Sequence, residues 1–203
     1  MSLTQAALVE PLSIGIYAVK LLRNKTAHAI GILGSGPIGL SVLLATKLAS
    51  VPTIFVTDKI DTRLQIAKQV GASWLGNPNK EDVVDLIKPN SLDSVFECCG
   101  DQQALDQAIN LLKPGGELLI VGIPDTNRVS FDVHKLRRKE ISIQNVRRQN
   151  NCTQTAIDLI ENEQLDVDFM AMHHFSLEQI AAAFEMVAGY KNGVIKAMIQ
   201  VGK

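Results

Sequence analysis

A glycine pattern between two apolar segments is the feature that most constrains the fold of this chain. Gly34, Gly36 and Gly39 form a G-x-G-x-x-G sequence, which follows an apolar run at residues 28–33 and opens a helical pattern at residues 37–49. In a strand–turn–helix unit, the first glycine permits the tight turn and the second lets the backbone approach a pyrophosphate. The third lets the helix pack closely on the strand. Because free N–H groups at a helix start favour phosphate, the pattern predicts a dinucleotide-binding turn.

An acidic residue stands at the position that this prediction requires. Asp58 ends a second apolar segment, residues 53–58, and lies 19 positions after Gly39. A carboxylate there can accept hydrogen bonds from both ribose hydroxyls of an adenosine and repels a 2′-phosphate, which favours NAD over NADP. Arg63, about one helical turn later, is expected to line the adenosine side. The simpler alternative is an ordinary glycine turn with Asp58 capping the next helix, but the combined spacing and strand context favour the nucleotide site.

Apolar strand patterns alternate with helical patterns over most of the chain. The alternation predicts right-handed crossovers and a parallel sheet covered on both faces, since its apolar runs are nearly continuous. The predicted fold class is therefore α/β, a doubly wound parallel sheet of six strands. The expected strands are 28–33, 53–58, 74–75, 93–98, 117–122 and 141–146, and the expected helices are 9–23, 37–49, 61–70, 80–88 and 102–113.

The carboxyl-terminal segment differs from this alternation. A helix at 154–162 precedes an extended segment at 168–176, a helix at 177–188 and a strand at 194–201, and neither strand fits into the six-stranded sheet. They are expected to form an added edge or part of another module. The predicted organisation is a linking helix region at 1–25, a nucleotide-binding domain at 26–152 and the returning helices and strands at 153–203.

Composition excludes several classes of protein. Lys and Arg sum to 20 and Asp and Glu to 21, which gives a formal net charge of -1 and argues against a general nucleic-acid binder. The three cysteines are odd in number and lack Cys-x-x-Cys spacing, which opposes a disulfide framework and a zinc knuckle and indicates a reducing, cytoplasmic location. The uncharged run between Lys25 and Lys47 is interrupted by Gly34, Gly36 and Pro37, which disfavours a membrane helix and a membrane partner.

Two other nucleotide-binding classes fit less well. Methyltransferases usually carry an acidic residue just before the glycines, where this chain has Ile32 and Leu33. Short-chain dehydrogenases need a Tyr-x-x-x-Lys pair, and neither Tyr17 nor Tyr190 is followed by lysine at that spacing.

Five motifs together resemble zinc-dependent medium-chain alcohol and polyol dehydrogenases, with the sorbitol dehydrogenase branch most similar. They are Glu-Pro-Leu-Ser-Ile-Gly from Glu10, Gly-Ser-Gly-Pro-Ile-Gly-Leu from Gly34, Thr-Asp-Lys-Ile-Asp-Thr-Arg-Leu from Thr57, Glu-Cys-Cys-Gly from Glu97 and Lys-Pro-Gly-Gly-Glu-Leu-Leu-Ile-Val-Gly from Lys113. The resemblance runs across essentially the whole chain. It implies that NAD accepts a hydride from an alcohol or polyol while zinc polarises the alcohol oxygen.

The resemblance also assigns residues to the cofactor and to the substrate. Residues of the glycine turn, the following strand ends and the Cys-Cys pair would contact NAD, and Arg148 would lie near the polyol. Gln149 replaces a tyrosine common in the sorbitol branch, which leaves polyol preference open. The implied cofactor-binding residues are Gly34, Gly36, Pro37, Ile38, Gly39, Asp58, Arg63, Cys98, Cys99, Val121, Gly122, Ile123, Val146 and Arg147.

Glu10 is the residue that the resemblance places toward the catalytic zinc. A zinc site needs about three protein ligands, and this chain lacks the Cys and His-Glu ligands of the family's preceding catalytic domain. We therefore expect zinc in the full-length enzyme but not on this chain, and no turnover by this chain alone. The alternative role for Glu10 is a first-turn carboxylate stabilised by a helix N-terminus.

Three other groups are expected to be structural. Cys98 and Cys99 point to opposite sides if they lie on a strand, so a core role is favoured over joint metal binding. His173 and His174 alternate in the same way. The basic run at 135–139 is expected to be a solvated helix face.

The remaining alternatives concern the class of protein and its assembly. A stand-alone nucleotide-binding or regulatory module and a zinc-independent quinone-type reductase both stay open, although Glu10 in its sequence context favours the zinc branch. The alternating segment 141–146 is expected at a sheet edge and poorly guarded against edge pairing, which predicts a homodimer or homotetramer.

Overall fold

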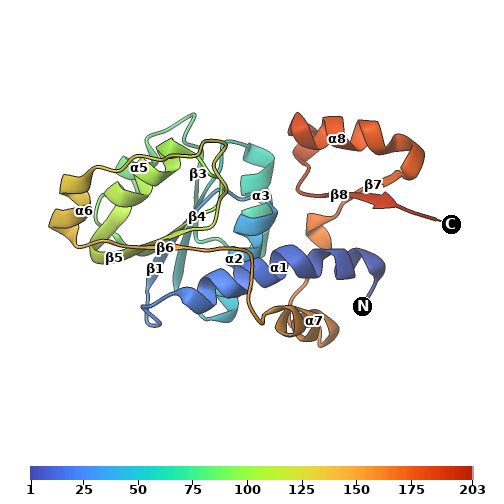
Figure 1. Ribbon diagram of the computed structural model, residues 1–203, viewed down its shortest axis with the longest axis horizontal. Helices are drawn as coiled ribbons and strands as arrows, with labels where there is room; N and C mark the ends of the chain where they lie inside the picture. Colours follow the sequence, from blue (N-terminus) through green and yellow to red (C-terminus); the bar gives the residue numbers. More distant parts are fainter. Residues whose placement is uncertain (203) are drawn as a thin grey trace.

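A six-stranded parallel sheet organises the computed structural model, which describes residues 1–202 (Figure 1). The strand order is β3-β2-β1-β4-β5-β6, and all five pairings are parallel. This order places the chain reversal between β1 and β4, which is the arrangement of a doubly wound nucleotide-binding fold. The predicted fold class is confirmed. The strands are β1 (Ala29–Leu33), β2 (Thr53–Thr57), β3 (Trp74–Gly76), β4 (Leu92–Glu97), β5 (Leu112–Ile120) and β6 (Ser142–Asn145).

Helices cover both faces of the sheet, and each face has its own apolar core. One core joins Leu12, Leu43 and Ile160 to the sheet, and the other contains Leu105 and Leu111. Buried strand residues such as Ile32 and Val95 belong to one core or the other, which explains the nearly continuous apolar strands. The helices are α1 (Leu3–Leu21), α2 (Pro37–Leu48), α3 (Asp61–Val70), α4 (Val83–Ile87), α5 (Gln102–Leu111), α6 (Val133–Lys139), α7 (Thr153–Glu161) and α8 (Ile180–Ala188).

The first helix begins earlier than the sequence predicts. α1 starts at Leu3 rather than residue 9, because Ser2 and Gln5 form a reciprocal capping box. Pro11 therefore lies inside the helix instead of in its first turn, and Glu10 lies well beyond the first turn. The prediction that Glu10 is a first-turn carboxylate is wrong for this reason.

The fifth strand also differs from its predicted bounds. β5 begins at Leu112, which pairs with Leu92 across an irregularity in the ladder, instead of at residue 117. It ends at Ile120, since the N–H groups of Val121 and Gly122 both turn to the carbonyl oxygen of Glu97. The strand end is thereby tied to the end of β4.

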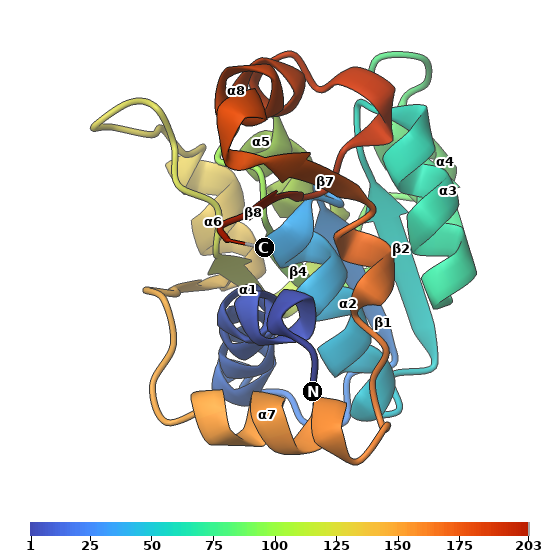
Figure 2. The ribbon, with the colours of Figure 1, turned by 90° about the vertical axis from the view of Figure 1, so that its right-hand side faces the viewer.

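The two strands of the C-terminal segment lie outside the six-stranded sheet, as the sequence predicts, and they pair with each other in a separate parallel sheet, which it did not predict. β7 (His173–Ser176) pairs with β8 (Ala197–Gln200), with α8 between them in sequence. The extended segment is shorter than expected, because Asp168–Met170 form a 3₁₀ turn. Figure 2 shows β7, β8 and α8 together, at the opposite side of the molecule from α7. Two further 3₁₀ turns span Leu177–Gln179 and Lys191–Gly193.

The basic run on α6 is not wholly solvated. Lys139 donates hydrogen bonds to the carbonyl oxygens of Ile109, Asn110 and Leu112, at 2.6, 3.0 and 2.9 Å. These carbonyl groups lie at the C-terminal end of α5, where the last carbonyl oxygens of a helix have no N–H partner within the helix. Lys139 therefore joins α6 to the end of α5, while the rest of the run stays at the surface. Among residues 1–202, no helix has the length and apolarity needed to cross a membrane.

Candidate nucleotide-binding site

A cavity of about 340 Å³ lies at the carboxyl ends of β1, β2 and β4. Open parallel sheets bind ligands at this edge, beside the point where the strand order reverses. Its walls come from the glycine turn and from the loops after β2 and β4, with Tyr190 added from the C-terminal segment. The lining residues are Leu33, Gly34, Thr57, Asp58, Lys59, Ile60, Arg63, Pro78, Cys99, Asp101, Gln103, Ala104, Gln107 and Tyr190.

The three glycines have distinct steric surroundings in the turn. Gly34 has φ +99°, a conformation that disfavours other residues, and its N–H donates to the carbonyl oxygen of Thr57 at 2.8 Å. A Cβ on Gly39 would lie 1.8 Å from the Gly34 carbonyl oxygen, so α2 packs directly on the turn. A Cβ on Gly36 would meet only Arg63 Nη1, at 3.5 Å. The backbone is therefore open at Gly36 and closed at Gly39, which fits a turn that receives a phosphate.

Asp58 connects the glycine turn to the start of α3. Its Oδ2 accepts from the backbone N–H of Ser35 at 2.7 Å and from the Ser35 hydroxyl at 3.0 Å. Its Oδ1 accepts from the N–H of Ile60 at 2.8 Å. Ile60, not Asp58, is the N-cap residue of α3, so Asp58 is not the helix cap of the simpler alternative. A carboxylate offers about four acceptor positions, which leaves about one for a ligand in the cavity that Asp58 lines.

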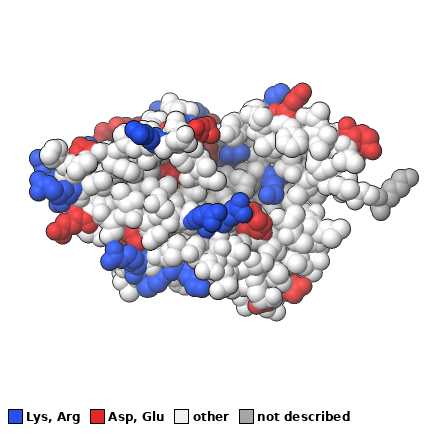
Figure 3. All heavy atoms as spheres, viewed as in Figure 1, with Lys and Arg blue, Asp and Glu red and all other residues white. Residues whose placement is uncertain are grey.

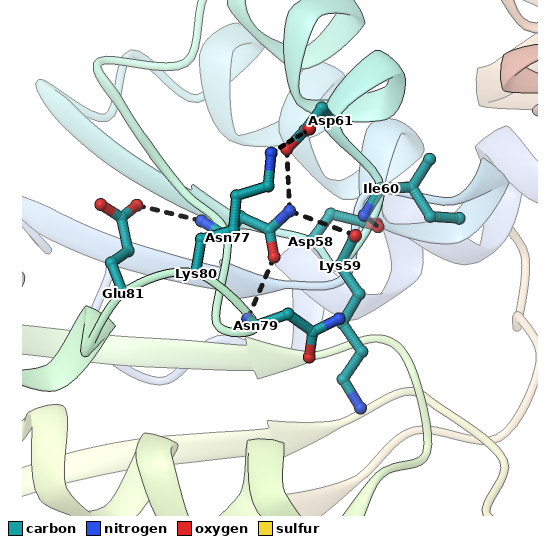
Figure 4. Close-up of polar contacts among 8 residues, drawn as sticks. All are labelled: Asp58, Lys59, Ile60, Asp61, Asn77, Asn79, Lys80 and Glu81. Carbon is teal, nitrogen blue, oxygen red and sulfur yellow. Dashed lines mark hydrogen bonds and ion pairs between the residues drawn. The ribbon is translucent and has the colours of Figure 1, made fainter.

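Lys59 is held by its backbone on one side and by its ammonium group on the other. The Asn77 side chain donates to the Lys59 carbonyl oxygen at 3.2 Å and to Asp61 Oδ1 at 2.8 Å (Figure 4). Lys59 Nζ lies 2.5 Å from Asp101 Oδ2, which joins the loop after β2 to the loop after β4. The hydrogen bond to Asp101 raises the pKa of Lys59, and the same contact lowers the pKa of Asp101. Both groups therefore stay charged near neutral pH.

Arg63 connects the phosphate turn to the C-terminal segment. Its Nη2 donates to the Val194 carbonyl oxygen at 3.0 Å, and its guanidinium carbon lies 5.1 Å from the centre of the Tyr190 ring. The other end of the guanidinium approaches Gly36. Arg63 lines the same cavity as Asp58 and also lies beside the glycine turn, and its predicted contact with the adenosine side stays a prediction.

The Cys-Cys pair follows β4 instead of lying on it. The Cys98 N–H donates to the Leu33 carbonyl oxygen, and the N–H groups of Cys99 and Gly100 donate to Glu97 Oε1, at 2.7 and 2.5 Å. Burial raises the pKa of the Cys98 thiol, and the neighbouring Glu97 carboxylate adds to the effect. The thiol is therefore protonated at neutral pH, which makes it a poor metal ligand and fits the structural role favoured by the sequence.

A second cavity, of about 180 Å³, lies at the ends of β4, β5 and β6. Gly122 and Val146 line it together with Glu97 and Asn145. Val121 is buried beside it, while Ile123 is 89% exposed. Of the residues that the resemblance assigns to nicotinamide, Gly122 and Val146 thus line this second cavity, while Val121, Ile123 and Arg147 do not.

Several predicted site residues line neither cavity, namely Glu10, Gly36, Pro37, Ile38, Gly39, Cys98, Val121, Ile123, Arg147 and Arg148. Glu10 is exposed on α1, and Arg147 and Arg148 are exposed after β6. In the part of the chain that the structure describes, no three His, Cys, Asp or Glu side chains are grouped closely enough to hold a metal ion. Because a catalytic zinc site uses about three protein ligands, these residues do not by themselves fit one.

Several lining residues were missed by the sequence reasoning. Lys59 directly follows Asp58, and Asp101 precedes the helix of α5 as its N-cap, so both could have been found from the rule that parallel strands end at one edge. Glu97 opens the Glu-Cys-Cys-Gly motif and is fully buried. The sequence did not indicate that Tyr190 lines the site, because Tyr190 contacts Arg63, which is far away in the sequence.

The sequence profile of the zinc-binding dehydrogenases matches residues 37–162, which is more than half of the chain. The chain belongs to this family. A sorbitol dehydrogenase from Bacillus subtilis (strain 168) is 32% identical over 203 residues, covering 98% of this chain and 58% of that protein. The chain thus spans a little over half the length of such curated relatives.

Solved structures of the family share the fold described above. A 2R,3R-butanediol dehydrogenase from Bacillus subtilis is 25% identical with a TM-score of 0.88, covering 100% of this chain and 59% of that one. A putative zinc-binding dehydrogenase from Sinorhizobium meliloti 1021 bound to NADP is 26% identical with a TM-score of 0.87, covering 96% of this chain and 58% of that one. The described residues therefore superpose on the cofactor-binding portion of these dehydrogenases, one of which was solved with NADP bound.

Proposed function

We propose that this chain binds NAD as the cofactor-binding portion of a zinc-dependent alcohol or polyol dehydrogenase. The observation that carries the proposal is the cavity in which the glycine turn and Asp58 meet. In the whole protein, hydride would pass from a secondary alcohol to NAD. The alcohol substrate is inferred from relatives such as the sorbitol and butanediol dehydrogenases.

The preference for NAD over NADP rests on the position of Asp58. Its carboxylate lines the cavity, with about one acceptor position left for a ribose hydroxyl. A 2′-phosphate placed there would meet the same carboxylate at close range, which costs affinity. One solved relative is bound to NADP and another is complexed with NADH, so the preference of this chain is proposed from its own residues.

The residues of this chain would bind and orient the cofactor. The N-terminus of α2 directs free N–H groups and the positive end of its dipole toward the turn, and Arg63 adds a guanidinium beside Gly36. Backbone groups near Gly122 and Val146 would hold the nicotinamide at the second cavity. NAD, when bound, supplies the hydride acceptor.

The residues proposed to lie near the zinc and near the substrate rest on the resemblance to the family. Glu10 would face the metal, and Arg148 would lie near the substrate in the complete protein, with further ligands from outside the described residues. A domain boundary near residue 25, pairing of β7 and β8 with a catalytic domain, and a cytoplasmic location belong to the same proposal.

The test compares the affinities for NADH and NADPH by fluorescence titration. We expect NADH to bind more tightly, and Asp58→Ala to narrow the gap because the carboxylate that accepts from ribose and repels phosphate is removed. Asp85→Ala is the matched control, since Asp85 is exposed on α4 outside both cavities. Equal or reversed affinities in the unsubstituted chain would contradict the ribose assignment.

A further inference from the structure

The Lys59–Asp101 ion pair spans the cavity wall beside the residue proposed to hold the ribose. Lys59 lies directly after Asp58, at the end of β2, and Asp101 begins α5 after β4. Both side chains line the cavity, and their charged atoms are 2.5 Å apart. The pair therefore lines the same cavity as Asp58, the residue proposed to face the ribose position where NAD and NADP differ.

The charges in the cavity wall balance. In the described part of the chain, two cations, Lys59 and Arg63, and two acids, Asp58 and Asp101, line the cavity. Arg63 donates through Nη2 to the Val194 carbonyl oxygen and lies over the Tyr190 ring, and its Nη1 is directed to Gly36 in the turn proposed for the pyrophosphate. Lys59 is the cation closest in sequence to Asp58, and it is 47% exposed, so its ammonium can reach a ligand once it is released.

We infer that Asp101 is a specificity-determining residue, because it occupies the one lysine that would otherwise attract a 2′-phosphate. The inference rests on the proposed NAD site. Asp58 repels a 2′-phosphate, but Lys59 beside it would offset that repulsion if its charge were free. By pairing with Lys59, Asp101 leaves the Asp58 carboxylate as the dominant charge toward the ribose.

The two carboxylate oxygens of Asp101 make different contacts, so a substitution can remove the contact with Lys59 and keep the helix cap. Oδ1 accepts from the N–H of Gln103 at 2.8 Å and caps α5, while Oδ2 contacts Lys59. Asparagine caps helices about as well as aspartate does. Asp101→Asn therefore keeps the cap and removes the charge, and Asp101→Ser keeps a capping oxygen on a side chain too short to reach Lys59.

The experiment measures the dissociation constants of NADH and NADPH for the chain, for D101N, for D101S and for the double variant K59M/D101N. We expect both single variants to bind NADPH about fivefold more tightly, with NADH changed by less than about twofold, a size typical of one partly exposed charge contact. The gain should disappear in K59M/D101N, and it should shrink at high salt because the contact is solvent-accessible.

The outcomes separate this inference from the proposed function. If the unsubstituted chain binds neither cofactor, the nucleotide proposal itself fails, and this inference with it. If NADH binds but NADPH affinity is unchanged in folded D101N and D101S, the role of Asp101 is overturned while the NAD site stands. A gain that persists in K59M/D101N would also overturn it, since the effect would not pass through Lys59.

Discussion

At the scale of single residues, two glycines of the turn have different steric roles. Gly39 is needed for packing of the fold, and Gly36 is expected to be needed for approach of the ligand. The methyl group of Gly39→Ala would collide with the Gly34 carbonyl oxygen, whereas that of Gly36→Ala would meet only the end of a flexible arginine. We expect G39A to lose about 1–3 kcal/mol of unfolding free energy through overpacking. We expect G36A to keep its stability but bind NADH about tenfold more weakly, because a side chain then stands where pyrophosphate approaches.

Thermal unfolding and NADH titration of the two variants check this prediction together. A G36A chain that binds NADH normally would show that no phosphate approaches that backbone. A G39A chain of normal stability would show that α2 can move away from the turn.

Sequence reasoning predicted from local spacing that the glycine turn and Asp58 form one site, and the structure brings Gly34 and Asp58 to the same cavity. The same reasoning did not find the Lys59–Asp101 pair, because the two residues stand 42 positions apart and meet only when β2 and β4 flank β1. It misjudged Glu10 because the capping box that starts α1 at Leu3 was overlooked. Lys139 was expected to be solvated because its acceptors are backbone carbonyl oxygens. Every residue has such an oxygen, so the sequence does not indicate which of them a lysine contacts.

At the scale of elements, Asp93 joins the start of β1 to β4 and β5. Its Oδ2 accepts from the N–H groups of His28 and Ala29, both at 2.9 Å, and its Oδ1 contacts Lys113 at 2.7 Å. Burial alone would raise the pKa of Asp93, but the contacts with Lys113 and the two N–H groups outweigh it, so the pKa is lowered below 3.8. The carboxylate thus stabilises the folded chain above this pH.

We expect Asp93→Asn to lower the unfolding free energy by about 1–2 kcal/mol at pH 7. A lowered pKa in the folded state means that the stabilisation is present above pH 3.8 and is lost as the pH falls through the folded value. The difference between D93N and the unsubstituted chain should therefore shrink below about pH 4. Urea unfolding across this range measures it, with the exposed Asp85→Asn as control; a difference independent of pH would contradict the assignment.

Element bounds were predicted best where one local signal ends the element. Gly71 has φ +114° and ends α3 at the predicted residue. β5 was predicted poorly, because its first residues join the sheet through an irregular pairing with Leu92 that depends on tertiary contact.

At the scale of the whole molecule, β6 is one of the two edge strands of the large sheet, and β3 is the other. β6 pairs with β5 on one side, and among the described residues no strand pairs with its other side. Ile143 on this strand is 37% exposed, and no Lys, Arg or Pro lies within β6 to guard the edge. We expect two copies to join through β6 into one continuous sheet, which sedimentation velocity at about 10 μM would detect as a dimer.

Ile143→Lys tests the same surface, because an inserted charge opposes edge pairing. It should give a monomer with unchanged NADH affinity, since Ile143 lines neither cavity. Figure 3 shows Lys and Arg scattered among Asp and Glu over the visible face. A monomeric unsubstituted chain would exclude this interface.

The parallel sheet has a further consequence for the order in which the chain folds. The central strand β1 pairs with β2 on one side, but its other neighbour, β4, lies far along the chain: Ile30 faces Ser94. At a synthesis rate of about 10 residues per second, β1 leaves the ribosome several seconds before β4. During this interval one edge of the most apolar strand has no native partner, so newly made chain depends on helix packing, or on a chaperone, to cover it.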